Sequence, residues 1–117
     1  MEKIKLTFTD FDCHLNGRTT VATINAIIYH FAWGTNYIVA TKRFKIKITR
    51  KSEDTPDLNK VFKYCKAELE LRAYDWAANK INNCALDVKN RLKAYNDFTY
   101  KALHIVSHNK EYISKLN

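Results

Sequence analysis

Apolar and polar residues alternate along the first fifty residues, which predicts β-strands with one face turned to a core. The alternation is clearest over Tyr37–Lys51. Its apolar positions are Ile38, Ala40, Phe44, Ile46 and Ile48, and its basic positions on the opposite face are Arg43, Lys45, Lys47 and Lys51. This segment therefore predicts a strand that buries one face and carries positive charge on the other.

Residues 3–15 predict another strand, but its apolar positions change parity on passing Thr9. They are Ile4, Leu6 and Phe8, followed by Phe11, Cys13 and Leu15. A regular strand cannot bury both sets on one side, so we predict a bulge near Thr9 and Asp10. Asn16-Gly17 then supplies the two residues preferred in a type I′ hairpin turn.

The apolar residues of Thr19–Phe31 fit the spacing of a helix, which Gly34 would terminate. They also fit the alternation of a strand. Seven of the ten residues 19–28 are Thr, Val or Ile, which favours a strand. Residues 33–36 would then turn the chain into the Tyr37–Lys51 segment. The result is an antiparallel meander of three strands, with Thr19–Phe31 in the centre.

Helical periodicity begins after the acidic segment 52–57. Thr55, Pro56 and Asp57 combine a capping hydroxyl, a proline suited to the first turn and a carboxylate that complements the helix dipole. We therefore predict that a helix starts at residue 55. The apolar stripe expected to pack on the sheet consists of Leu58, Phe62, Cys65, Leu69 and Trp76.

The apolar spacing continues to Val106, but one helix from Pro56 to Val106 would be roughly 75 Å long, too long for a compact domain of this size. We predict a break at Asn82-Asn83, with Asn96-Asp97 as the second choice. An uninterrupted helix would instead require a coiled-coil oligomer. The helical part is thus expected over residues 55–106, followed by a frayed or separately docked tail over residues 107–117.

The predicted fold class is α+β in the order β-β-β-α-α, a three-stranded antiparallel β-meander followed by two helices packed on one sheet face. The length of 117 residues indicates a single domain, with residues 1–51 as its basic sheet. This order of elements is similar to that of small DNA-binding sheets that insert one face into a groove, as in the arm-binding domains of phage-type integrases. The similarity covers about half the chain and includes no diagnostic motif.

The net charge of +8 is unevenly distributed. Residues 1–51 contain nine Lys/Arg and three Asp/Glu, whereas residues 52–117 contain eleven and nine. Such a basic region attracts polyanions or acidic proteins. Lysine outnumbers arginine fifteen to five, and because arginine is the better reader of bases, this excess favours attraction to phosphates.

The basic strand face is therefore the main candidate site. Its predicted nucleic-acid-binding residues are Lys3, Lys5, Arg18, Arg43, Lys45, Lys47, Arg50 and Lys51. Tyr29, Trp33 and Tyr37, near the second hairpin, are candidates for stacking on bases or for contacting a partner. A purely structural role competes with this interpretation, because lysines on edge strands also protect a sheet from aggregation.

Two groups of residues resemble metal ligands, but each has a simpler explanation or is incomplete. Asp10, Asp12 and His14 coincide with the predicted bulge, and His104 and His108 have no evident third ligand. The chain also lacks an evident nucleophile–base motif, and its two glycines are too few for most nucleotide sites. We expect no enzymatic activity, no metal and no cofactor.

Two functions fit these expectations. The first is a small binding protein that contacts nucleic acid or a ribonucleoprotein. The alternative is an inhibitor or adaptor of phage or mobile-element type that binds a host protein through residues 31–37 and the helices, which would also allow a homodimer. Cys13, Cys65 and Cys84 form no C-x-x-C pair, and no apolar run approaches the roughly 18 residues of a membrane helix. We therefore expect a reducing, cytoplasmic location and no membrane partner.

Overall fold

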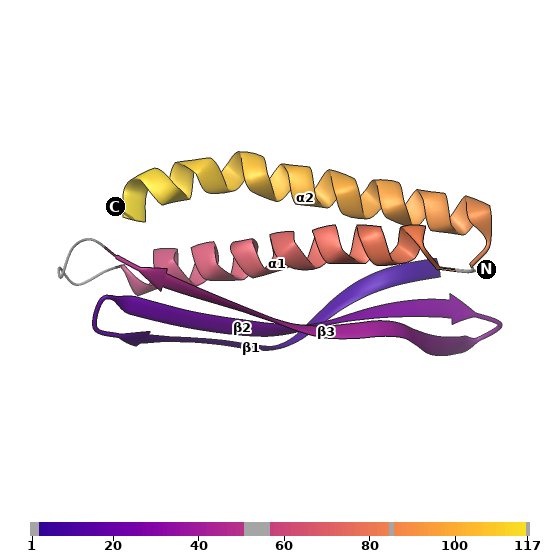
Figure 1. Cartoon of the computed structure of the whole chain (residues 1–117), viewed down its shortest axis with the longest axis horizontal. Coiled ribbons are helices and arrows are strands. Elements are labelled where there is room, and N and C mark those ends of the chain that lie inside the picture. Colours follow the sequence, from indigo (N-terminus) through magenta and orange to yellow (C-terminus); the bar gives the residue numbers. More distant parts are fainter. Residues whose placement is uncertain (1–2, 51–56, 85, 117) are drawn as a thin grey trace.

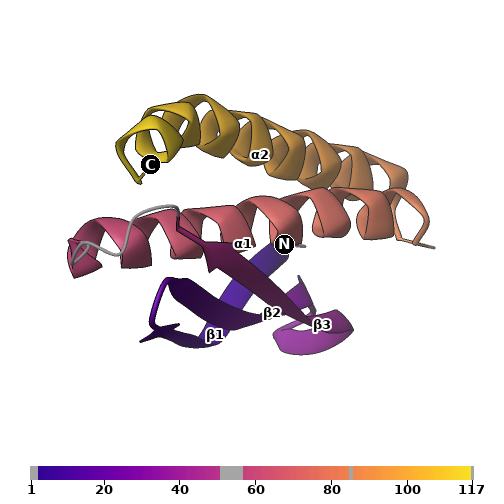
Figure 2. The ribbon, with the colours of Figure 1, turned by 60° about the vertical axis from the view of Figure 1, so that its left-hand side comes forward.

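The computed structural model describes residues 3–50, 57–84 and 86–116, with side chains described as far as residue 108. These residues form three antiparallel strands followed by two helices, which confirms the predicted α+β fold. The strands are β1 (Lys3–Asn16), β2 (Thr19–Ala32) and β3 (Thr35–Thr49), and the helices are α1 (Leu58–Asn82) and α2 (Val88–Leu116). The molecule is elongated, 53 × 25 × 20 Å, with α1 between the sheet and α2 (Figure 1, Figure 2).

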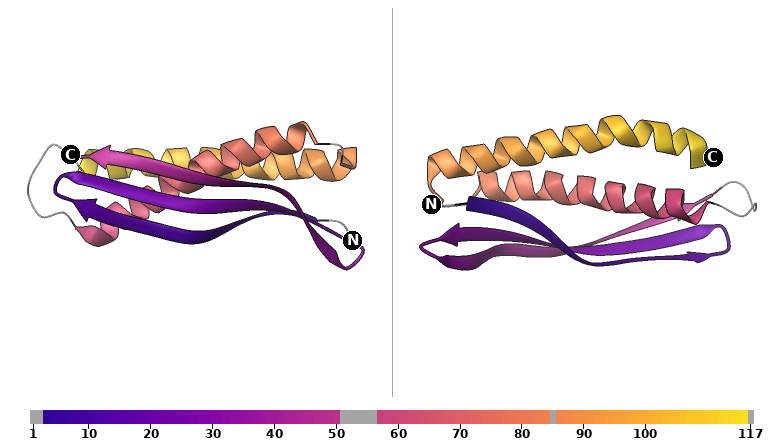
Figure 3. Two further views of the ribbon diagram at one scale, coloured as in Figure 1. Left: turned by 60° about the horizontal axis from the view of Figure 1, so that its bottom comes forward. Right: turned by 180° about the vertical axis from the view of Figure 1, so that it is seen from behind.

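The central position of β2 confirms the strand predicted for Thr19–Phe31. The sheet order is β1-β2-β3, and Figure 3 shows the strands side by side with the helices behind them. On the side that faces the helices, the residues of β2 other than His30 are buried, namely Thr20, Ala22, Ile24, Ala26, Ile28 and, at the end of the strand, Ala32. The small alanines allow α1 to approach the sheet closely. The opposite surface of the sheet, which faces away from the helices, is called the outer face below.

Two bulges change which side chains lie on the outer face. The first confirms the prediction, because the β1–β2 register shifts between Thr9 and Asp12, and Asp10 has a φ of 54°. The second, at Val39, was not predicted. Because Val39 is an extra residue in β3, Ile38 pairs with Tyr29 on the outer face and is 61% exposed, whereas Ala40 stays on the inner face. The prediction that Ile38 and Ala40 share a face is wrong.

The first hairpin turn differs from expectation, whereas the second lies within the predicted residues 33–36. The central residues of the first turn are Gly17 and Arg18, one position later than the predicted Asn16-Gly17, and of these two only Gly17 has positive φ. The second turn has positive φ at both Trp33 (56°) and Gly34 (74°), as a type I′ turn requires. A tryptophan rarely adopts this conformation, and here its side chain is 92% exposed.

Both ends of the connection between α1 and α2 are capped. α1 ends at Asn82 with Asn83 as its C-cap, which confirms the predicted break, and Asp87 accepts a hydrogen bond from the Asn90 amide at the start of α2. α1 begins at Leu58, where the Asp57 carboxylate accepts hydrogen bonds from backbone amides of the first turn. The helix therefore begins later than the predicted residue 55, and Asp57 is its cap instead of part of its first turn. The predicted cap Thr55 and the predicted first-turn residue Pro56 lie outside the described residues. α2 continues to residue 116, so the prediction of a separate tail after residue 106 is wrong.

The helices form two successive layers on the sheet. α1 contacts all three described strands, whereas α2 lies mainly on α1 and reaches the sheet, within the described residues, only at β1. The prediction that both helices cover the sheet face is therefore only partly right. The buried stripe of α1 is Val61, Cys65, Leu69, Ala73, Ala77 and Ile81. Of the predicted stripe, Cys65 and Leu69 are buried and Phe62 and Trp76 pack against the buried cluster, whereas Leu58 is 49% exposed and its assignment is wrong. The small residues Ala73 and Ala77 were not predicted, and they are buried because α1 lies between the sheet and α2.

Cys13 of β1 packs against the buried cluster that contains Cys65 of α1. Cys65 is fully buried, and this burial, followed by the proximity of Cys13, raises the pKa of the Cys65 thiol to about 12. Burial also raises the pKa of Cys13. Both side chains therefore stay protonated at neutral pH and behave as small core residues.

Glu70, half-buried on α1, provides a test of how burial on this helix affects stability. Burial raises the pKa of its carboxyl above the ordinary 4.5, against the opposing effect of Lys66. The native state therefore binds the proton more tightly than the unfolded state, and the stability that this proton confers is lost as pH rises from about 4.5 through the raised native pKa. Glu70→Gln is thus expected to increase the free energy of unfolding at pH 7, with the gain shrinking towards pH 4. Urea denaturation at both pH values checks this, and a loss of stability at pH 7 would contradict it.

Candidate nucleic-acid interface

The strand register brings cations from both edge strands to the outer face. In β1, Lys3 pairs with Phe31 and Lys5 with Tyr29. The cations of β3 on this face, with their β2 partners, are Arg43 (Asn25), Lys45 (Thr23) and Lys47 (Val21). All five cations are exposed. The predicted juxtaposition of these residues is therefore present in the structure.

The two cation groups lie at opposite ends of the face, joined by the central strand. The β2 partners extend from Phe31 to Val21, ten residues, which corresponds to roughly 33 Å of strand. Between them the outward residues of β2 are half-buried. The outer face thus offers a long, partly apolar surface with positive charge at one end of β1 and at the opposite end of β3.

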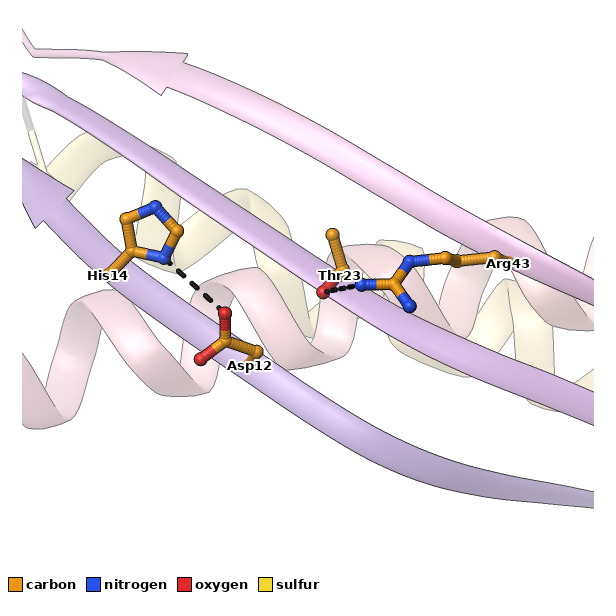
Figure 4. A network of polar contacts seen from close by, with 4 residues as sticks. All are labelled: Asp12, His14, Thr23 and Arg43. Carbon is orange, nitrogen blue, oxygen red and sulfur yellow. Dashed lines mark hydrogen bonds and ion pairs between the residues drawn. The ribbon is translucent and has the colours of Figure 1, made fainter.

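Asp10 and Asp12 also lie on the β1 side of this face, and each has a partner. The Asp10 carboxylate accepts a hydrogen bond from the side-chain amide of Asn25 at 2.9 Å, and Asp12 Oδ2 lies 3.4 Å from His14 Nδ1. Figure 4 shows the Asp12–His14 pair on β1, across the sheet from Arg43, whose Nη2 donates to Thr23 Oγ1 at 3.3 Å. The carboxylates are therefore at the end of β1 away from Lys3 and Lys5.

Of the remaining predicted cations, Arg50 does not join the five. Arg50 is only 8% exposed, and its Nη2 donates to the Gly17 carbonyl at 3.0 Å while its backbone amide donates to the Arg18 carbonyl. It fastens the end of β3 to the first hairpin, so its assignment to a binding surface is corrected. Arg18 is exposed in that hairpin turn. Lys51 lies outside the described residues.

The three predicted aromatic residues do not form one platform. Tyr29 lies on the outer face, Trp33 is in the second hairpin turn, and Tyr37 pairs with His30, with ring centroids 6.4 Å apart. The bulge at Val39 reverses the parity of β3 and so turns Tyr37 away from the outer face. Phe31, two residues after Tyr29 on the same strand, was missed, although the alternation of β2 places it beside Tyr29.

A hollow of about 680 Å³ opens on the outer face near the second hairpin. Its lining residues are Lys3, Lys5, Thr7, Tyr29, Phe31 and Asn36. None of these described lining residues is acidic. The same two lysines also line a smaller hollow of about 180 Å³ between β1 and α2, where Lys93 adds a further cation and Asp97 a carboxylate. Lys93 could not be assigned from the sequence, because it depends on how α2 packs.

The groups considered as metal ligands are not assembled into a site. The first bulge leaves Asp10 bonded to Asn25, while Asp12 pairs with His14. Within the part of the chain that the structure describes, no three His, Cys, Asp or Glu side chains are placed to share a metal ion. His104 and His108 are adjacent on exposed positions of α2, with ring centroids 4.2 Å apart.

Comparisons with protein-family models, with curated proteins and with solved structures give no match. The similarity in element order to the arm-binding domains of phage-type integrases thus gains no support from them. Among the described helices, none is both long and apolar enough to cross a bilayer.

Proposed function

We propose that the protein binds nucleic acid, free or within a ribonucleoprotein, through the outer face and mainly through phosphates. The observation that carries the proposal is the placement of Lys3, Lys5, Arg43, Lys45 and Lys47 on one sheet face, with Lys3 and Lys5 at a hollow lined by aromatic side chains. Exposed lysines attract phosphates as mobile point charges. We propose a binding role without catalysis or cofactor.

Protection of the sheet edges explains part of this arrangement. Lysines on β1 and β3 hinder pairing with other strands whether or not a ligand binds. Edge protection does not, however, require half-exposed aromatic rings next to the lysines of β1, as Tyr29 and Phe31 are placed. The combination of charge and stacking surface is typical of proteins that bind nucleic acid along a strand.

Salt dependence tests the proposal. If the five cations each neutralise one phosphate, a plot of the logarithm of the single-strand association constant against the logarithm of salt concentration should have a slope of about −3.5. This is roughly a 100-fold loss of affinity between 50 and 200 mM salt. Fluorescence anisotropy with labelled DNA and RNA, single-stranded and duplex, measures this. Absence of binding to every oligonucleotide at 50 mM salt would overturn the proposed function, and binding that ignores salt would overturn the phosphate mode.

A second candidate function, binding of a host protein as an inhibitor or adaptor, is favoured by a different surface. α2 exposes Val88, Leu92 and Leu103 on the side that is not packed against α1. Such side chains commonly mark a protein interface, including a homodimer through the helices. A partner that stays bound after nuclease treatment and at 200 mM salt would favour this candidate, because packed apolar interfaces depend less on salt than phosphate contacts do.

A further inference from the structure

We propose that the hollow near the second hairpin receives an unstacked base, so that the ligand of the outer face is single-stranded nucleic acid. This inference rests on the proposed function and adds the strandedness of the ligand. It also assigns separate tasks to the two ends of the face. The β3 cations hold the backbone, and the hollow binds bases.

The register gives each aromatic ring of the hollow a lysine as its direct neighbour. Phe31 lies between Lys3 on β1 and Asn36 on β3, and Tyr29 lies between Lys5 and the exposed Ile38. Directly opposed residues in a sheet have Cβ atoms about 5 Å apart. A base stacked on either ring therefore has its own phosphate within reach of a lysine ammonium group.

The chemistry of the lining fits a nucleobase better than it fits a small anion. The volume of about 680 Å³ is within the range of small-ligand pockets, and two aromatic side chains together with the methyl-bearing Thr7 supply apolar surface. The polar groups of the lining that can reach a base edge, the Thr7 and Tyr29 hydroxyls and the Asn36 side-chain amide, each both donate and accept hydrogen bonds, so they do not select one base. We therefore expect stacking with little sequence preference.

A duplex cannot use such a site. Its bases are stacked on each other, so their flat faces are covered and only their edges are reachable in the grooves. A single strand presents the faces directly, and stacking on a protein aromatic ring strengthens binding on the order of 10- to 100-fold per base. The arrangement of Tyr29 and Phe31 should therefore separate single strands from duplexes of equal length.

The test uses the full chain and four fluorescein-labelled probes at 50 mM salt: a mixed-sequence 15-nucleotide single strand as DNA, the same strand as RNA, the matching duplex, and a single strand of abasic sites. We expect the normal single strand to bind at least 10-fold more tightly than the duplex or the abasic strand. Equal affinity for the single strand and either of these probes would overturn the inference while the proposed function stands. Binding to none of the probes would overturn both.

Variants locate the effect in the hollow. Tyr29→Thr with Phe31→Thr keeps β-forming residues in β2 and should bring single-strand affinity down to that of the abasic strand. Val21→Thr with Ile27→Thr is the matched control, because both residues point outward from the same strand but lie outside the hollow lining. An equal loss in both variants would contradict the assignment. The abasic comparison uses the unaltered chain, so it decides the question even if the variant does not fold.

Discussion

Reversal of the charge at Arg43, Lys45 and Lys47 by substitution with Glu is expected to weaken nucleic-acid binding at least 100-fold at 100 mM salt. Each substitution removes an attraction to a phosphate and adds a repulsion. Because three phosphate contacts are lost, the log–log salt slope should also become less steep by about 2. All three side chains are exposed, so the variant should keep its fold, which circular dichroism can verify. Anisotropy titrations between 50 and 200 mM salt measure both effects.

A control variant separates local charge from total charge. Lys60, Lys63 and Lys66 are exposed on α1, on the other side of the sheet, and their replacement by Glu produces the same fall in net charge, from +8 by six units to +2. This control should lose much less affinity than the β3 variant. Equal losses would show that only the total charge matters, and no loss in the β3 variant would eliminate β3 as the contact surface.

Alternation was sufficient to predict the first and third strands and most of the faces on which their side chains lie, whereas the central strand also needed the Thr, Val and Ile content of residues 19–28. The parity change around Thr9 revealed the first bulge, because two sets of apolar residues could not be buried together. The bulge at Val39 left no such signal, since Ile38, Val39 and Ala40 are all apolar and any of them could face the core. The orientation of Tyr37 therefore could not be predicted.

Arg50 shows the opposite case, a residue that parity could have placed. It follows Phe44, Ile46 and Ile48 at even positions of the strand, so alternation puts it on the inner side. Its positive charge led to its assignment to the outer face, but its guanidinium instead satisfies the carbonyl of Gly17. Spacing decides the face of a side chain more reliably than charge does.

The helix packing could be predicted only in outline. Large apolar residues suggested the stripe of α1, but its closest contacts use Ala73 and Ala77, which are buried on a helix that has the sheet on one side and α2 on the other. The sequence does not distinguish an alanine chosen for helix propensity from one chosen for close approach. Because the buried alanines of α1 could not be recognised, the placement of α2 could not be predicted. The position of Lys93 beside Lys3 and Lys5 depends on that placement.

Replacement of Phe98 by Ala is expected to lower the free energy of unfolding by about 3–5 kcal/mol, a large share of the roughly 5–15 kcal/mol of a typical domain. Phe98 is 4% exposed, and its ring centroid lies 6.0 Å from that of Tyr74, which in turn lies 5.6 Å from that of Phe8 on β1. These rings connect α2, α1 and the sheet, so truncation leaves a cavity where the layers meet. Urea denaturation measures the loss.

Tyr100→Ala is the matched control, because Tyr100 is also an aromatic residue of α2 but is 71% exposed, and its loss should change stability by no more than about 0.5 kcal/mol. The effect of Phe98 should extend to the outer face, since Ile4 packs against the buried cluster that contains Phe98 and lies between Lys3 and Lys5. Under conditions where the Phe98→Ala variant is still folded, single-strand affinity should fall while the Tyr100 variant binds normally. Unchanged affinity would show that the hollow is positioned by the sheet alone.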